Sequence, residues 1–172
     1  MYQKILVPLD GSALSELALS PAETLAHHFG SEIILIRVSQ PVTMPVELYP
    51  ALAGVAYDYR LKVQGQIEKD AREYLIDWQK KVQRAGIKCR YLALEGFVSE
   101  AILRAVETEA VDLIVMSTHG RSGLSRWVFG SVATRVLEAA PCPIFLVRAK
   151  NCTPKTDILN GLQARQSNVI HK

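Results

Sequence analysis

The chain has 172 residues, of which 49% are apolar and 22% are charged, a balance typical of one globular domain with a full core. The net charge of +3 at pH 7 belongs to residues 149–172, because the remaining residues carry 16 basic and 16 acidic groups. A neutral body argues against a broad nucleic-acid-binding face, and no apolar run reaches the roughly 18 residues that span a bilayer.

The first forty residues predict a strand, a helix and a second strand. Residues Lys4–Leu9 are apolar on both sides of the two-residue period, as in a strand buried on both faces. An Asp-Gly-Ser turn at 10–12 follows, and its serine is a good N-cap for a helix that runs to about Phe29 and ends at Gly30. Residues Glu32–Val38 predict the second strand.

Residues 39–55 interrupt this alternation, because three prolines and a glycine exclude a continuous element. The segment is still apolar, so we expect a lid or a contact surface there. A long helix over about 56–85 follows and ends at Gly86. Apolar residues at helical spacing predict its buried face. These residues are Val63, Ile67, Ala71, Tyr74, Trp78 and Val82.

The remainder of the chain predicts three more strands and two more helices. The strands are Ile87–Leu94, Val111–Ser117 and Ile144–Arg148, and the helices are Ser99–Glu109 and about Trp127–Ala139. Strands that alternate with helices in this way predict a parallel sheet covered on both faces. We expect one domain over 1–149 and a polar, basic tail over 150–172.

A glycine-rich stretch at 117–131 joins the fourth strand to the last helix. Ligands of open α/β sheets bind beyond the carboxyl ends of the strands, and the unpaired amides that open a helix favour phosphate. Gly130 and Ser131 provide such amides together with a hydroxyl donor. The spacing is not that of a Walker A loop, so a plain strand-to-helix connection also fits this stretch.

Asp10 stands at the end of the first strand. A carboxylate in this place can accept hydrogen bonds from a ribose hydroxyl or a base amine. Alternatively, Asp10 caps the first helix, which is a common use of aspartate. If the first and fourth strands are neighbours, Asp10 and the glycine-rich stretch line one crevice.

Four motifs in this order are similar to those of the universal stress protein family, over about residues 2–148: ILVPLDGS, DLIVMSTHGRSG, GSVATRVL and CPIFLV. The resemblance implies a three-layer, doubly wound α/β fold of Rossmann type, with five parallel strands in the order 3-2-1-4-5. Many members with this pattern bind ATP through Gly-x-x-Gly, nine residues and Gly-Ser/Thr. Gly120 and the pair Gly130-Ser131 match the later part of that pattern.

The resemblance also implies roles for single residues. Gly120, Gly130, Ser131 and the amide of Val132 would face the phosphates. Asp10 and the backbone of Val38 would face the adenine, and Pro8 and Met116 would pack on the base or the ribose. The predicted nucleotide-binding residues are therefore Pro8, Asp10, Val38, Met116, Ser117, Gly120, Arg121, Gly123, Gly130, Ser131 and Val132.

Ser117 departs from the pattern, because it stands where the first glycine is expected. Serine adds a Cβ atom and a hydroxyl where the chain passes close to the ribose. It is costly if the backbone there needs a positive φ angle, and it is tolerable if the backbone is strand-like.

No nucleophile–base pair and no metal-ligand spacing stand out in the sequence, so we expect no catalytic residues and slow or absent ATP hydrolysis. A Mg or Mn ion would be held through the nucleotide's phosphates. The last strand, Ile144 to Val147, would be an apolar edge strand that pairs with a second copy.

The sequence therefore predicts a cytoplasmic, homodimeric, nucleotide-binding regulatory protein of the stress response. It would bind ATP, AMP or ADP, with an unidentified protein partner and with no contact to nucleic acid or membrane. Two alternatives stay open: a ligand-free dimeric interaction module of the same fold, and a slow ATPase.

Overall fold

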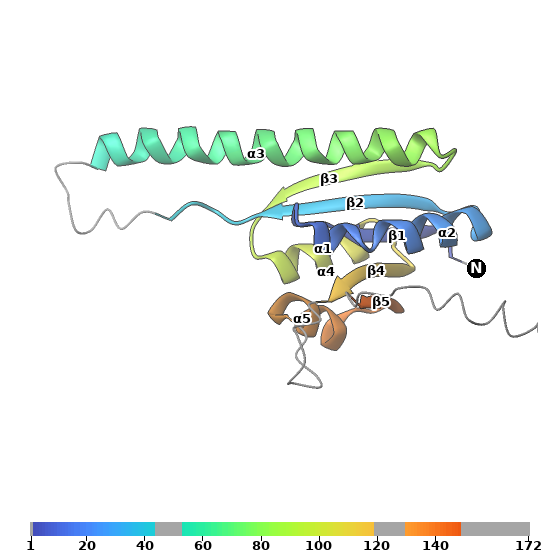
Figure 1. Cartoon of the computed structure of the whole chain (residues 1–172). Helices are drawn as coiled ribbons and strands as arrows, with labels where there is room; N and C mark the ends of the chain where they lie inside the picture. The colour runs from blue at the N-terminus through green and yellow to red at the C-terminus, as the bar shows by residue number, and fades with distance from the viewer. Residues whose placement is uncertain (1, 44–52, 119–129, 149–172) are drawn as a thin grey trace, which may run out of the picture.

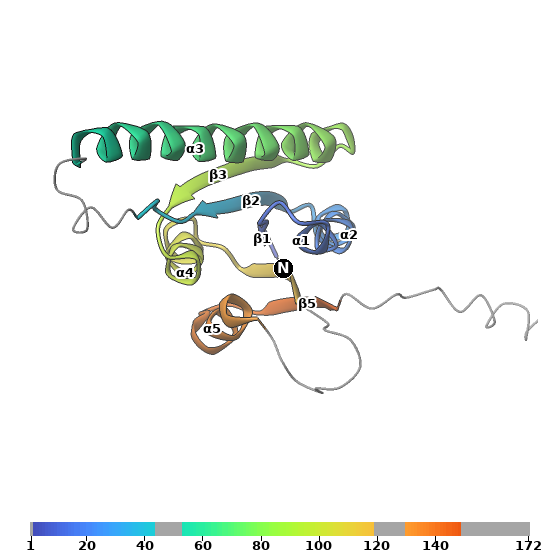
Figure 2. The ribbon, with the colours of Figure 1, turned by 60° about the vertical axis from the view of Figure 1, so that its left-hand side comes forward.

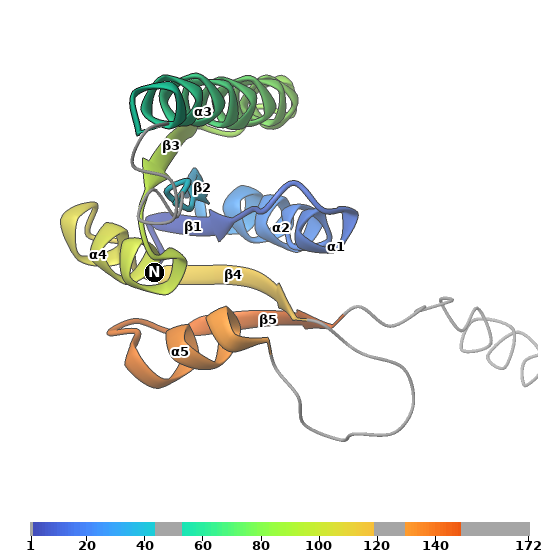
Figure 3. The same cartoon turned by 90° about the vertical axis from the view of Figure 1, so that its left-hand side faces the viewer.

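The computed structural model describes residues 2–43, 53–118 and 130–148. Its centre is a sheet of five parallel strands in the order β3-β2-β1-β4-β5, which confirms the predicted topology (Figure 3). The strands are β1 (Lys4–Pro8), β2 (Glu32–Ser39), β3 (Cys89–Glu95), β4 (Leu113–Thr118) and β5 (Ile144–Arg148).

Helices cover both faces of the sheet, as expected for parallel strands. They are α1 (Ala13–Glu16), α2 (Leu19–Phe29), α3 (Ala53–Arg84), α4 (Val98–Thr108) and α5 (Ser131–Ala139). Helices α4 and α5 lie on one face and α1 and α2 on the other, while α3 runs along β3 (Figure 2). The fold is thus a three-layer, doubly wound α/β domain.

The alternation of side chains along each strand divides the interior into two cores. In β1, Ile5 and Val7 face the core beneath α2 and α3, whereas Leu6 faces the core beneath α4 and α5. All three side chains are fully buried. A central strand that is covered on both faces is therefore expected to be apolar at every position, without the alternation of apolar and polar residues seen in half-exposed strands.

The first helix is broken, which corrects the continuous helix expected up to Phe29. The single turn α1 ends at Glu16, and α2 begins at Leu19. Pro21 explains the break, because proline lacks an N–H and its ring clashes with the carbonyl four residues earlier, here that of Leu17. The end of α2 is as expected, since Gly30 adopts a left-handed conformation with φ of 70°.

The long helix α3 begins at Ala53, and its amino-terminal half extends past the tips of β2 and β3 (Figure 1). A helix of 32 residues is about 48 Å long, whereas the seven residues of β3 cover about 23 Å. The expected buried stripe therefore fails beyond the sheet: Ile67 is 36% exposed. Leu75, which is absent from the predicted stripe, is fully buried.

Other boundaries also differ from expectation; β3 and β4, for example, each begin two residues later than predicted. Gly130 is extended, with φ of −60° and ψ of 157°, so α5 begins at Ser131 rather than near Trp127. The irregular segment is shorter than 39–55, because Ser39 belongs to β2 and α3 already includes residues 53–55. The rest of that segment at 44–52 lies outside the described residues.

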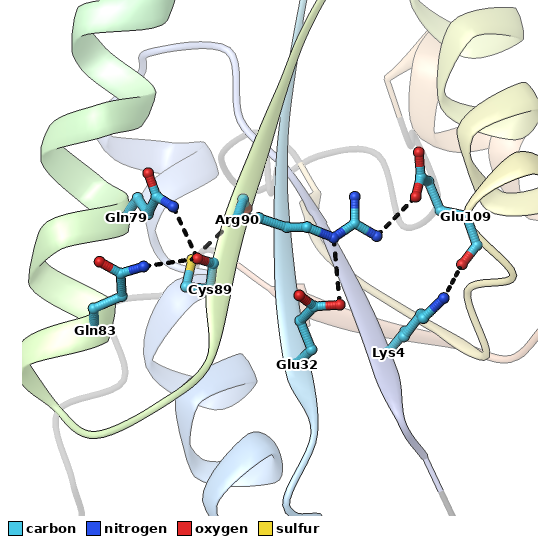
Figure 4. A network of polar contacts seen from close by, with 7 residues as sticks. All are labelled: Lys4, Glu32, Gln79, Gln83, Cys89, Arg90 and Glu109. Atoms are coloured by element: carbon cyan, nitrogen blue, oxygen red, sulfur yellow. Dashed lines mark hydrogen bonds and ion pairs between the residues drawn. The ribbon is translucent and has the colours of Figure 1, made fainter.

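A polar network ties the helices to the sheet at the amino ends of the strands (Figure 4). The Arg90 side chain lies 3.3 Å from Glu32 and 2.7 Å from Glu109, so it joins β3, β2 and the end of α4. The Lys4 ammonium donates to the Glu109 carbonyl at 2.7 Å. On the other side of β3, Gln79 and Gln83 of α3 both donate to the carbonyl of Cys89.

Within the three described stretches, no helix combines the length and the apolar character needed to cross a membrane.

Candidate functional site

A cavity of about 340 Å³ opens at the carboxyl ends of β1, β2 and β4. This volume lies within the range of about 300–1,000 Å³ that is typical of small-molecule sites. The predicted residues that line it are Pro8, Asp10, Val38, Met116, Ser117, Gly130, Ser131 and Val132. The predicted residues Gly120, Arg121 and Gly123 lie outside the described part of the chain.

The strand order explains why the cavity forms here. β1 pairs with β2 on one side and with β4 on the other, with Ile5 beside Leu113 and Leu6 beside Ile114. β1 is followed by helices on one sheet face, whereas α5, the helix after β4, lies on the other face, so a crevice opens at the point where the strand order reverses. Asp10 and the start of α5 therefore lie at the same crevice.

Other lining residues were not predicted from the sequence. They are Leu9, Ser12, Leu14, Ser15, Ile36, Val98, Ile102 and Ala133. Ile36 could have been predicted from the sequence, because it lies two positions before Val38 in the same strand and therefore shares its sheet face. Val98 and Ile102 are one helical turn apart on the buried side of α4. Together these side chains give the cavity an apolar wall.

The Asp10 carboxylate is held by the turn that follows it. Its Oδ1 atom accepts hydrogen bonds from the Ser12 amide at 2.8 Å and from the Ser12 hydroxyl at 2.6 Å. Ser12 is the N-cap of α1, and its Oγ accepts from the Ser15 amide at 3.1 Å. Asp10 therefore fixes the capping serine instead of capping the helix itself, and this orients its exposed carboxylate at the cavity.

Two opposing effects set the charge of Asp10. Partial burial raises the pKa of this carboxyl, but the hydrogen bonds from Ser12 and Ser15 together outweigh burial and lower the pKa below 3.8. Asp10 is consequently ionised at neutral pH and acts as a hydrogen-bond acceptor. An acceptor of this kind can bind a hydroxyl or an amine, and it would repel a phosphate.

The amino end of α5 has the opposite electrostatic character. Gly130 is its N-cap and makes no side-chain capping bond, so the first amides of the helix depend on other acceptors. Ser131 and Val132 line the cavity at this end. The helix dipole adds partial positive charge there, which suits an anionic group.

Ser117 belongs to β4 and is paired with Val147 of β5. Its backbone is strand-like; of the non-glycine residues described, Ala110 is the one with a positive φ angle. The cost of a serine at a positive φ angle, considered in the sequence analysis, therefore does not arise at Ser117. The cavity is open with the serine in place.

Gly11 lies in the turn between β1 and α1 and has a φ angle of +89°. A Cβ atom at this position would lie 3.1 Å from the Nη2 atom of Arg37. Both the backbone conformation and the close guanidinium therefore favour glycine here.

The described residues contain no cluster of three or more histidine, cysteine or carboxylate side chains that could hold a metal ion. Among the described lining residues, Asp10 carries the one ionisable side chain. The arrangement can therefore bind a ligand that is apolar and hydrogen-bonding at one end and anionic at the other.

Comparison with known proteins by sequence and by structure points to one family. The sequence model of the universal stress protein family matches residues 1–148. Universal stress protein MJ0531 of Methanocaldococcus jannaschii is 32% identical over 148 residues, which are 86% of this chain and 83% of that protein. The solved structure of MJ0577, from the same organism, covers 88% of this chain and 99% of its own, with a TM-score of 0.71 and 26% identity.

A more distant structure is that of a universal stress protein family member from Arabidopsis thaliana with AMP bound. It covers 90% of this chain and 97% of its own, with a TM-score of 0.61 and 17% identity. At this identity the likeness shows a shared fold.

Proposed function

We propose, since this chain belongs to the universal stress protein family, that it binds an adenine nucleotide and serves as a nucleotide-binding regulatory protein in the stress response. The observation that carries the proposal is the cavity between β1 and β4. It joins an apolar wall, an ionised carboxylate and the open amino end of a helix in one space.

These three parts match the three parts of a nucleotide. The apolar wall formed by residues such as Ile36, Val38 and Met116 suits the faces of a purine base. The exposed, ionised carboxylate of Asp10 suits the exocyclic amine of adenine or a ribose hydroxyl. The amides of Ser131 and Val132 and the Ser131 hydroxyl suit the phosphates.

The Arabidopsis thaliana relative with bound AMP supports this choice of ligand class. ATP, ADP and AMP share the base and the ribose and differ in the phosphates that would reach the amino end of α5. A Mg or Mn ion would accompany the polyphosphates, held by their oxygens.

In the proposed function, the protein hydrolyses ATP slowly or not at all. Phosphoryl transfer needs a positioned base or water and groups that neutralise charge on the transferred phosphate. In the described lining, Asp10 is the one ionisable group, and in the proposed binding mode it contacts the base or the ribose and not the terminal phosphate. We expect a turnover well below about one per second, the low end for ordinary enzymes.

The competing function is a ligand-free interaction module in which Ser117 closes the site. The open cavity and the strand-like backbone of Ser117 favour nucleotide binding over this alternative. The direct test is mass spectrometry of the small molecules released from freshly purified protein. An adenine nucleotide near one equivalent per chain supports the proposal, and its absence together with no binding of added nucleotide contradicts it.

In the proposed function, the protein acts as a homodimer in the cytoplasm. β5 is an edge strand of the described sheet, and Phe145 on it is 45% exposed. An apolar edge of this kind pairs readily with a second copy. Light scattering should give a dimer for the wild type and a monomer for Phe145→Lys. A wild type that is monomeric at tens of micromolar would contradict the dimer.

A further inference from the structure

The single turn α1 has two different sides. Leu14 and Ser15 line the cavity. Glu16, the next residue, reaches instead towards α3, where its Oε1 atom accepts a hydrogen bond from the Tyr74 hydroxyl at 2.9 Å. The same oxygen accepts from the Trp78 indole N–H at 3.2 Å. A wall of the cavity is therefore attached to a helix that does not itself line it.

Arg37 makes a second connection between the same parts. Its guanidinium lies close to Gly11, in the turn that holds Asp10. It also lies over the ring of Tyr74, 4.9 Å from the ring centroid. Tyr74 thus contacts α1 through its hydroxyl and, through Arg37, the turn before α1.

These contacts are strong enough to matter for so short an element. A helix of one turn has no stability of its own, because nucleation fixes several residues for one hydrogen bond. Hydrogen bonds to a carboxylate are about twice as strong as those between neutral groups. Glu16, Tyr74 and Trp78 are all partly buried, so water replaces these bonds poorly.

We propose that Glu16 and Tyr74 are positioning residues of the nucleotide site, which hold α1 and the turn at 10–12 in place from α3. The inference rests on the proposed function for its ligand. It gives α3 a role in binding, and linkage makes the effect reciprocal: a bound nucleotide that stabilises α1 also stabilises the contacts of Glu16 with Tyr74 and Trp78.

The first test compares nucleotide affinities by calorimetry. Glu16→Ala removes the acceptor, Tyr74→Phe removes one donor, and Glu16→Gln keeps an acceptor oxygen. We expect Kd values for ATP and AMP about three- to tenfold higher for the first two variants, and a smaller rise for Glu16→Gln, which keeps a neutral acceptor. Tyr59→Phe is the matched control, because Tyr59 lies on the same helix and is exposed.

The second test is spectroscopic and separates positioning from general stability. The chain has two tryptophans, so two indole N–H signals are expected by NMR, and Trp78→Phe assigns them. Saturation with ATP should shift the Trp78 signal in the wild type and leave it nearly unchanged in Glu16→Ala. Wild-type affinity in both Glu16→Ala and Tyr74→Phe, or an unmoved Trp78 signal at saturation, would overturn the inference.

A ligand-free measurement keeps this inference separate from the proposed function. If the wild type binds no nucleotide, the proposed function is wrong, and the positioning of α1 is judged by amide hydrogen exchange at 13–18. Faster exchange in Glu16→Ala and Tyr74→Phe, with a smaller increase in Glu16→Gln and wild-type exchange in Tyr59→Phe, supports positioning. Equal exchange in all variants overturns it.

Discussion

Asp10, at the end of β1, and Ser131, at the start of α5, line one cavity from opposite sides of the strand-order reversal. The first is an ionised acceptor and the second opens a helix whose dipole favours anions. A ligand that satisfies both must carry a hydrogen-bond donor at one end and an anionic group at the other. A nucleotide has both.

The first prediction concerns the charge at the start of α5. Ser131→Asp places a carboxylate at the amino end of the helix, which should raise the free energy of unfolding by about 0.3–1 kcal/mol. The same carboxylate should occupy the phosphate position and abolish binding of ATP. Thermal denaturation and calorimetry on one sample measure the two effects.

The matched control is Ser20→Asp, in the exposed first turn of α2 and away from the cavity. It should stabilise the protein to a similar degree and leave the affinity for ATP unchanged. Equal ATP affinity in Ser131→Asp and in the wild type would show that phosphates do not bind at this helix.

The second prediction concerns the carboxylate of Asp10. In Asp10→Asn, one side-chain oxygen can still accept from Ser12, but the second, charged acceptor is lost. Hydrogen bonds to charged groups contribute about 1.5–3 kcal/mol, so Kd for AMP should rise about tenfold or more. Asp58→Asn, on the exposed part of α3, should bind like the wild type. An unaltered Kd in Asp10→Asn would remove Asp10 from the site.

The third prediction concerns pH. Because the pKa of Asp10 is lowered in the folded protein, its contribution to stability is present above about pH 3.8 and is lost as the pH falls through the folded-state pKa. Carbon-detected NMR titration of the Asp10 carboxyl should therefore give a midpoint below 3.8. A midpoint above 3.8 would mean that the Ser12 and Ser15 hydrogen bonds do not outweigh burial.

The fourth prediction concerns the polar network at the amino ends of the strands. Arg90→Met breaks two partly buried ion pairs, with Glu32 and Glu109, and should lower the free energy of unfolding by about 1–2 kcal/mol. Lys69→Met, which breaks an exposed pair with Glu73, should change it by less than about 0.5 kcal/mol. Chemical denaturation of both variants measures the difference, and equal effects would contradict the structural role of Arg90.

The strand order and half of the described cavity lining could be predicted because local patterns and a family resemblance agreed. β1 and β2 are apolar on both faces, which is possible in a sheet covered on both sides. The turn after β1 carries Asp10 at a strand end, where parallel sheets bind ligands. These features depend on the order of elements and not on fine packing.

What could not be predicted depends on distance in three dimensions. The break after α1 is different, because Pro21 marks it in the sequence and the prediction of a continuous helix left this proline out. The exposure of Ile67 depends on where the sheet ends beneath α3. The contacts of Glu16 with Tyr74 and Trp78 join residues far apart in sequence, with no motif that marks them.

Calorimetric titration of the purified, nucleotide-free protein with ATP and with AMP tests the central claim most directly. The account predicts saturable heat with one nucleotide per chain for the wild type, and no ATP binding in Ser131→Asp. No heat for either nucleotide at high micromolar protein would contradict it.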